Sequence, residues 1–96
     1  MAHLVTIEAA YAQLRVGPTN VPDAFDIANK LDEAEDWAID LMGRNYNQFW
    51  TPETVPARIR AAILAMLTSL YDGDVEGKHM DLAYRLIDRW RDRVIA

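Results

Sequence analysis

The chain lacks cysteine altogether and has only two histidines, His3 and His79, among its 96 residues. The missing thiol excludes disulfide bonds, thiolate zinc sites, iron–sulfur ligation and cysteine nucleophiles. Neither histidine belongs to an HExxH motif or a comparable array, so a metal site would depend on carboxylates with little imidazole. We therefore expect no metal ion and no cofactor.

Sequence motifs that mark common active sites are missing as well. There is no GxxxxGK[ST] loop, no GxGxxG, no GxSxG elbow and no calcium loop. Asp32, Asp36 and Asp40 follow one another at four-residue intervals, and paired carboxylates can serve acid–base chemistry. Their predicted helix face is exposed, however, and the sequence indicates no neighbouring residue that would shift the pKa of these carboxylates. We predict that the protein is not an enzyme.

Positive charge and long apolar runs are also scarce. Ten Lys and Arg residues stand against fifteen Asp and Glu, a formal net charge of −5, which disfavours nucleic-acid binding by the whole molecule. The apolar run from Ile59 to Tyr71 is too short to span a bilayer, and the N-terminus lacks a basic segment followed by a long apolar one. We expect no membrane contact and synthesis inside the cell.

The most apolar stretch that is present runs over residues 54–72, TVPARIRAAILAMLTSLYD. Between Pro56 and Tyr71 the only charges are Arg58 and Arg60, both near the start. Thr54 and Pro56 are typical helix-start residues, and Asp72-Gly73-Asp74 ends the segment. Apolar residues at three- and four-residue spacing predict the central core helix of the protein: Ile59, Ala62, Ile63, Met66, Leu67 and Leu70.

A shorter helix is expected near the N-terminus. Thr6 is a good N-cap, and Gly17-Pro18 stops the helix. The connector 15–22 is rich in turn-forming residues, and its two prolines, Pro18 and Pro22, are expected to bar helix continuation. The apolar stripe of this first helix is Ile7, Ala10, Tyr11 and Leu14.

A second helix is predicted from Asp23, as its cap, to about Met42, before Gly43. One face is apolar, with Trp37 adjoining a stripe of Ile27, Leu31, Ala34, Ala38 and Leu41. The remaining surface is acidic and is either a solvated face or an electrostatic contact with a partner. Its acidic residues are Asp32, Glu33, Glu35, Asp36 and Asp40.

Three aromatic residues, Tyr46, Phe49 and Trp50, are concentrated in the connector 44–53 that follows. Such a cluster more often closes the edge of a small core than binds a ligand, although aromatic loop tips also anchor interfaces. We expect packing as the main role and leave the interface role open.

A fourth helix begins near His79 to Asp81 and has apolar residues at intervals of four, with Ala83, Tyr84 and Ile87 alongside them: Leu82, Leu86, Trp90 and Val94. Its arginines alternate with aspartates, which predicts a solvated surface with four ion pairs. The predicted pairs are Asp81 with Arg85, Arg85 with Asp88, Asp88 with Arg91, and Arg89 with Asp92. With 51% hydrophobic and 26% charged residues, the chain is predicted to be one all-α domain over residues 1–96, a small bundle of about four helices.

Charge is distributed unevenly along the chain. Residues 1–53 carry nine acids and three bases, a net charge of −6, whereas residues 54–96 carry six acids and seven bases, a net charge of +1. In a ring each subunit presents different surfaces to its two neighbours, so an acidic second helix can face a basic last helix. The candidate interface residues are Asp32, Glu35, Asp36, Phe49, Trp50, Arg85, Arg89, Trp90, Arg91 and Arg93.

The succession of segments resembles the gene-product-six-like head-tail connector family of tailed phages. A T-x-x-x-A-x-x-x-L-R opening helix, an acidic second helix closing in Gly-Arg, and a V-P-x-x-I-x-x-A-I-L helix ending near Tyr follow one another. The matching residues are Thr6, Ala10, Leu14, Arg15, Gly43, Arg44, Val55, Pro56, Ile59, Ala62, Ile63, Leu64 and Tyr71. Tyr11 departs from the lysine of many relatives, and the last segment, 78–96, matches only loosely.

The resemblance implies a helical adaptor of the virion that forms a ring, dodecameric in the particle, beneath the portal protein. The ring would extend the DNA channel without sequence-specific DNA binding and would present a surface to the next tail or stopper protein. The resemblance further implies that the terminal segment around Trp90, Arg91 and Arg93 reaches the portal, and that the acidic helix lines the channel or meets a neighbouring subunit.

Two other functions remain open at the level of the sequence. One is a small helical interaction or regulatory module, such as an antitoxin-like protein, which would form a defined dimer indifferent to a portal. The other is a nucleic-acid-binding domain, for which Arg85, Arg89, Arg91 and Arg93 are the only candidate strip.

Overall fold

A computed structural model describes residues 4–14, 21–73 and 77–92, with the backbone alone for 21–24. It contains four α-helices: α1 (Ile7–Leu14), α2 (Val21–Met42), α3 (Ala57–Asp72) and α4 (Lys78–Ile87). Two short 3₁₀ turns, η1 (Gly43–Asn45) and η2 (Asp88–Trp90), follow α2 and α4. No strand occurs in these three ranges, which confirms the all-α bundle of about four helices.

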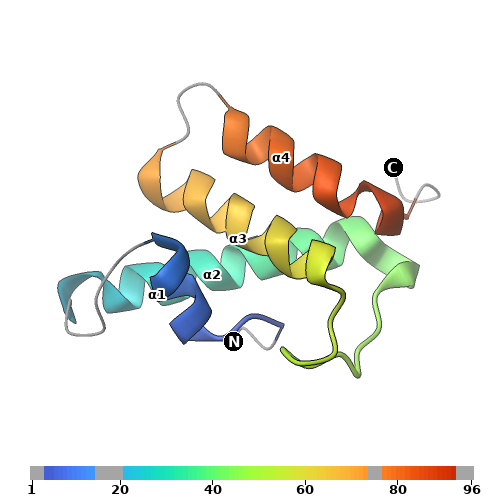
Figure 1. Cartoon of the computed structure of the whole chain (residues 1–96), viewed down its shortest axis with the longest axis horizontal. Helices are drawn as coiled ribbons and strands as arrows, with labels where there is room; N and C mark the ends of the chain where they lie inside the picture. Colours follow the sequence, from blue (N-terminus) through green and yellow to red (C-terminus); the bar gives the residue numbers. More distant parts are fainter. Residues whose placement is uncertain (1–3, 15–20, 74–76, 93–96) are drawn as a thin grey trace.

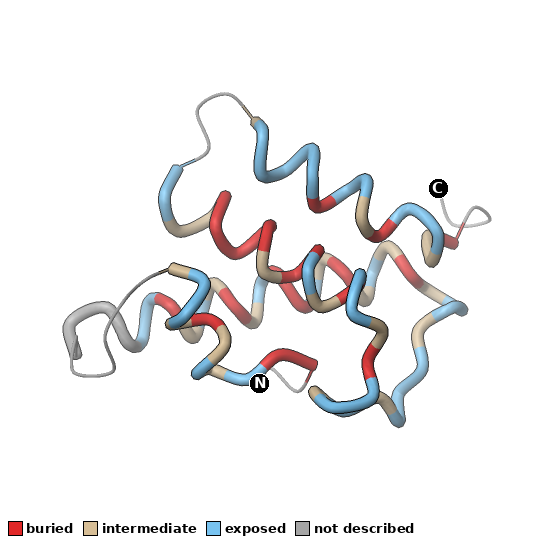
Figure 2. The backbone as a smooth tube through the Cα atoms, in the orientation of Figure 1, coloured by how far each residue is buried: buried red, intermediate tan, exposed pale blue. Residues whose placement is uncertain are grey.

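Helix α3 lies between α2 and α4, and α1 packs against α2 and α3 (Figure 1). The inner surfaces of the helices are buried and the outer turns of α4 are exposed (Figure 2). Eight of the sixteen residues of α3 are buried, which confirms that the most apolar segment is the central core helix. The buried residues of α3 are Ile59, Ala62, Ile63, Ala65, Met66, Leu67, Thr68 and Ser69.

The start of α1 follows the predicted capping. The Thr6 hydroxyl accepts a hydrogen bond from the Ala9 N–H at 3.1 Å, so it satisfies one of the free donors of the first turn. Ala10 is buried, whereas Ile7, Tyr11 and Leu14 are half-buried against the core. Arg15, Gly17 and Pro18 lie outside the described residues.

The start of α2 differs from the prediction. The helix begins at Val21, so Asp23 lies inside the first turn and is not the cap. Pro22 does not bar the helix, because its missing N–H would have had no intrahelical partner in the first turn. The end agrees: α2 stops at Met42, and Gly43 adopts a positive φ of 48° that few other residues tolerate.

Helix α3 begins at Ala57, with Pro56 in an extended conformation as its N-cap. Thr54 belongs to the preceding turn, where its hydroxyl accepts a hydrogen bond from the Thr51 N–H at 2.8 Å. The helix ends at Asp72, and Gly73 follows with a φ of 75°. This agrees with the expected stop.

Helix α4 is shorter than predicted, and its most buried residues are ones that were predicted to lie alongside the apolar stripe. It ends at Ile87, where the backbone tightens into η2. Ala83 and Ile87 are its buried residues, whereas Leu82, predicted to be a core residue, is 42% exposed. The inner face is formed by Ala83, Ile87 and the half-buried Trp90. In so short a helix, a period of 3.6 residues fits more than one choice of apolar stripe. Val94 lies outside the described residues.

Candidate interaction surfaces

The outer surface of α2 carries a row of carboxylates. Glu33, Asp36 and Asp40, here named the α2 acidic ridge, are all exposed, and their spacing of three and four residues places them on one side of the helix. Ala34 and Ala38, on the inner side, are fully buried. Asp32 is half-buried at the edge of the ridge. The α2 acidic ridge therefore points away from the core.

Glu35 is not part of this surface, contrary to the prediction. Its side chain is 2% exposed, and its Oε2 accepts a hydrogen bond from the backbone N–H of Leu4 at 3.1 Å. Leu4 and Val5 are themselves core residues. A buried carboxylate needs such donors, because burying an unpaired charge is costly. Glu35 thus holds the segment before α1 against α2, and it is removed from the candidate interface.

The buried Glu35 carboxylate also affects Tyr46. Burial, with a smaller contribution from the charge of Glu35, raises the pKa of the Tyr46 hydroxyl above its ordinary value. A raised pKa means that the folded state favours the neutral phenol. This stabilisation is complete below the pKa of the unfolded chain, about 10, and is lost as the pH rises through the pKa of the folded state.

We predict that Glu35→Gln lowers the pKa of Tyr46 but leaves it above the ordinary value, because burial, the larger cause, remains. Ultraviolet difference titration of each protein against its Tyr46→Phe counterpart isolates this tyrosine from the other three. Asp36→Asn, a change at an exposed carboxylate of the same helix, serves as the control and should leave the titration unchanged. An unchanged midpoint in Glu35→Gln would contradict the electrostatic coupling.

The loop between η1 and α3 is held by its own hydrogen bonds. Asn47 accepts bonds from the N–H groups of Phe49 (2.9 Å, to its side chain) and Trp50 (3.1 Å, to its carbonyl). Tyr46 and Trp50 pack edge to face, with ring centroids 6.0 Å apart. Packing at the core edge is thus confirmed for these two half-buried rings. Phe49 differs, because its side chain is 80% exposed at the tip of the loop.

The exposed side chains of α4 and η2 carry charges of both signs. Leu82 and Arg85 of α4 and Arg89 of η2, here named the α4 ridge, are exposed and follow one another at a spacing of three and four residues. The same spacing places Asp81, Tyr84 and Asp88 on another side. Tyr84 packs edge to face on Trp37 of α2, with ring centroids 5.2 Å apart. Asp81 and Asp88 lie four and three residues from Arg85, so the α4 ridge has carboxylates along one edge.

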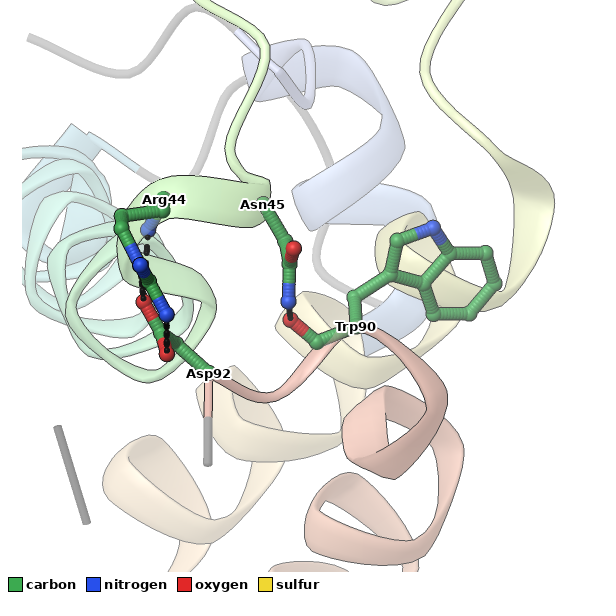
Figure 3. Close-up of polar contacts among 4 residues, drawn as sticks. All are labelled: Arg44, Asn45, Trp90 and Asp92. Carbon is green, nitrogen blue, oxygen red and sulfur yellow. Dashed lines mark hydrogen bonds and ion pairs between the residues drawn. The ribbon is translucent and has the colours of Figure 1, made fainter. Parts of the chain in front are cut away.

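The end of α4 is joined to the end of α2 by a polar contact that sequence reasoning missed (Figure 3). Asp92 is 4% exposed, and its Oδ2 accepts bonds from the Arg44 backbone N–H at 3.0 Å and from Arg44 Nε at 3.1 Å. The Asp92 N–H donates to the Leu41 carbonyl at 2.9 Å, and Asn45 Nδ2 donates to the Trp90 carbonyl at 2.9 Å. The hydrogen bond from the Arg44 side chain to Asp92, together with the charge of Asp92, raises the pKa of Arg44 above its ordinary value.

These contacts revise the predicted roles of the last segment. Asp92 pairs with Arg44, 48 residues away, whereas its predicted partner was Arg89 and no partner was predicted for Arg44. The Arg89 guanidinium lies 5.9 Å from the Trp90 ring centroid, and Trp90 and Arg91 are half-buried. Arg93 lies outside the described residues. The candidate arginine strip for nucleic acid is therefore exposed at Arg85 and Arg89 and not along its whole length.

The structure thus separates the candidate residues into three exposed surfaces: the α2 acidic ridge, the loop tip at Phe49, and the α4 ridge. Phe25, 83% exposed near the start of α2, was not singled out from the sequence, because exposure of one aromatic residue leaves no pattern. Within the ranges that the structure describes, no group of three or more His, Cys, Asp and Glu residues could hold a metal ion. None of the helices described combines the length and hydropathy needed to cross a membrane.

Comparison with known proteins adds no relative: no family model, no curated protein and no solved structure matches this chain.

Proposed function

We propose that the protein is a structural head-tail connector of a tailed phage or phage-like particle. Its copies would form a ring beneath the portal protein, dodecameric in the particle, that extends the DNA channel and joins the next tail or stopper protein. Its place would be the head-tail interface of the virion, after assembly in the host cytoplasm. The activity is association, with no bond made or broken.

The observation that carries the proposal is the exposed Phe49 side chain on a loop held by hydrogen bonds and ring packing. A preformed loop loses little conformational entropy on binding, and aromatic side chains are enriched among the residues that dominate interface energies. The succession of helical segments resembles the connector family, and this resemblance indicates the portal protein as the partner. Repeated weak contacts within a closed ring become strong through multivalency.

Phe49→Ala tests the proposal without disturbing the core, because the side chain that it removes is 80% exposed. We expect weakening of portal docking by about tenfold or more, the loss typical of an aromatic interface anchor. Native mass spectrometry of the chain with purified portal protein measures the docked fraction.

Phe25→Ala is the matched control, since it removes an equally exposed phenylalanine from another part of the surface. It should dock as the unaltered chain does. If Phe49→Ala docked as well as the unaltered chain, the loop tip would not be part of the portal contact. Absence of docking by the unaltered chain, together with a stable dimer indifferent to portal, would favour the alternative of a helical interaction or regulatory module.

A further inference from the structure

We infer that the α4 ridge of one copy of this chain docks on the α2 acidic ridge of a second copy. The inference rests on the proposed function and specifies how neighbouring subunits of the ring recognise each other. Its starting point is the α4 ridge, where Leu82 is 42% exposed between the inner face of the helix and two exposed arginines. An apolar side chain beside Arg85 and Arg89 is a surface suited to an acidic, partly apolar partner.

The chain itself carries the matching surface. The α2 acidic ridge offers carboxylates at 36 and 40, and the α4 ridge offers guanidinium groups at 85 and 89. Both pairs are four residues apart, which is about 6 Å along an α-helix and slightly more where the chain enters η2 at Asp88, so two ion pairs can form at once when the helices align.

The two ridges cannot meet within one copy. Helices α2 and α4 pack against α3 from different sides (Figure 1), and each ridge lies on the outer side of its helix. The side of α4 nearer to α2 is occupied by Tyr84, which packs on Trp37. A contact between ridges therefore joins two copies head to tail, and because the two surfaces differ, it repeats from copy to copy and gives a ring when the rotation between copies closes.

Charge reversal tests the pairing directly. One variant carries Glu33→Lys, Asp36→Lys and Asp40→Lys, and the other carries Arg85→Glu and Arg89→Glu. All five positions are exposed, so circular dichroism should show that both variants fold. Each variant alone brings like charges together, and we expect its self-association to be at least about tenfold weaker than that of the unaltered chain.

An equimolar mixture of the two variants restores both contacts, because each reversed ridge now faces a ridge of opposite charge. We expect assemblies that contain the two variants in alternation, measured by native mass spectrometry with and without portal protein. These assemblies should weaken as salt rises from about 0.05 to 0.5 M, since the Debye length shortens from about 14 to 4 Å. A mixture that assembles no better than either variant alone would overturn the inference.

Cross-linking gives a second measurement that does not depend on charge. Because the chain has no cysteine, Asp36→Cys with Arg85→Cys in one molecule introduces the only two thiols. Oxidation, free or on the portal, should give a ladder of covalent oligomers beyond the dimer. A ladder that stops at dimers, or no product in either condition, counts against head-to-tail docking. Glu8→Cys with Arg85→Cys is the control, with one thiol moved to the exposed surface of α1.

The two proposals fail in different ways. Portal docking by the unaltered chain combined with failure of the mixture and of the cross-link would leave the connector function standing and remove the ridge contact. Successful ridge pairing without any affinity for portal would leave a self-assembling helical module and remove the connector function.

Discussion

Replacing Leu67 with alanine is expected to destabilise the folded chain by about 3 kcal/mol, the middle of the range for a leucine in a well-packed core. Leu67 is fully buried in the central helix α3, within the single core cluster that all four helices share. The loss combines the transfer free energy of the removed methyl groups with the cavity that remains. For a domain whose total stability is about 5–15 kcal/mol, this is a large fraction.

Thermal or urea unfolding followed by circular dichroism measures the effect, with an expected decrease in melting temperature of about 12–24 °C. Leu64→Ala is the matched control, because Leu64 lies one turn earlier in the same helix and is half-buried. Leu64→Ala should lower the free energy of unfolding clearly less than Leu67→Ala does. Equal losses at the two positions would show that α3 is not surrounded in the way that its burial indicates.

Asp92→Ala is expected to cost about 2 kcal/mol, the scale of hydrogen bonds to a charged group. The buried carboxylate accepts both the backbone N–H and the side chain of Arg44, so its removal leaves donors of η1 without their acceptor. The contact joins the ends of α2 and α4 and closes a long stretch of chain. Its loss should therefore loosen η2 as well as lower the free energy of unfolding.

Urea unfolding gives the free-energy change, and amide hydrogen exchange of residues 88–92 reports the local loosening. Asp26→Ala is the control, since Asp26 also forms an ion pair, with Lys30 at 2.7 Å, but at an exposed position. Surface pairs of this kind contribute about 0–1 kcal/mol. If Asp92→Ala cost no more than Asp26→Ala, the buried contact would not stabilise the fold.

Local sequence rules predicted the helices well where the signals are local. The Thr6 cap, the stop at Gly43, and the Pro56 start and Gly73 end of α3 all depend on backbone groups within a few residues. The same rules were wrong at Asp23, because a proline in the first turn of a helix is compatible with either a stop or a start.

The surfaces were predicted less well, since exposure depends on neighbours that are distant in the sequence. Glu35 belongs to an acidic run, which predicts a surface residue. In the structure it is buried and accepts a hydrogen bond from the backbone N–H of Leu4, 31 residues earlier. The spacing of Leu82 predicts a core residue. In the structure Ala83 and Ile87 are the buried residues of α4, and Leu82 is exposed beside the arginines. Phe49 could be predicted to lie in an aromatic loop, but not that it is the ring left in solvent.

The amino-acid sequence alone establishes a small, acidic, cysteine-free all-α chain whose most apolar helix is its core, because periodicity, caps and composition act over one or two helical turns. Tertiary structure alone decides which carboxylate is buried, which aromatic ring stays exposed, and that Arg44 meets Asp92. The physical reason is packing: burial of a side chain depends on which helix lies across from it, and residues adjacent in the sequence do not specify that partner.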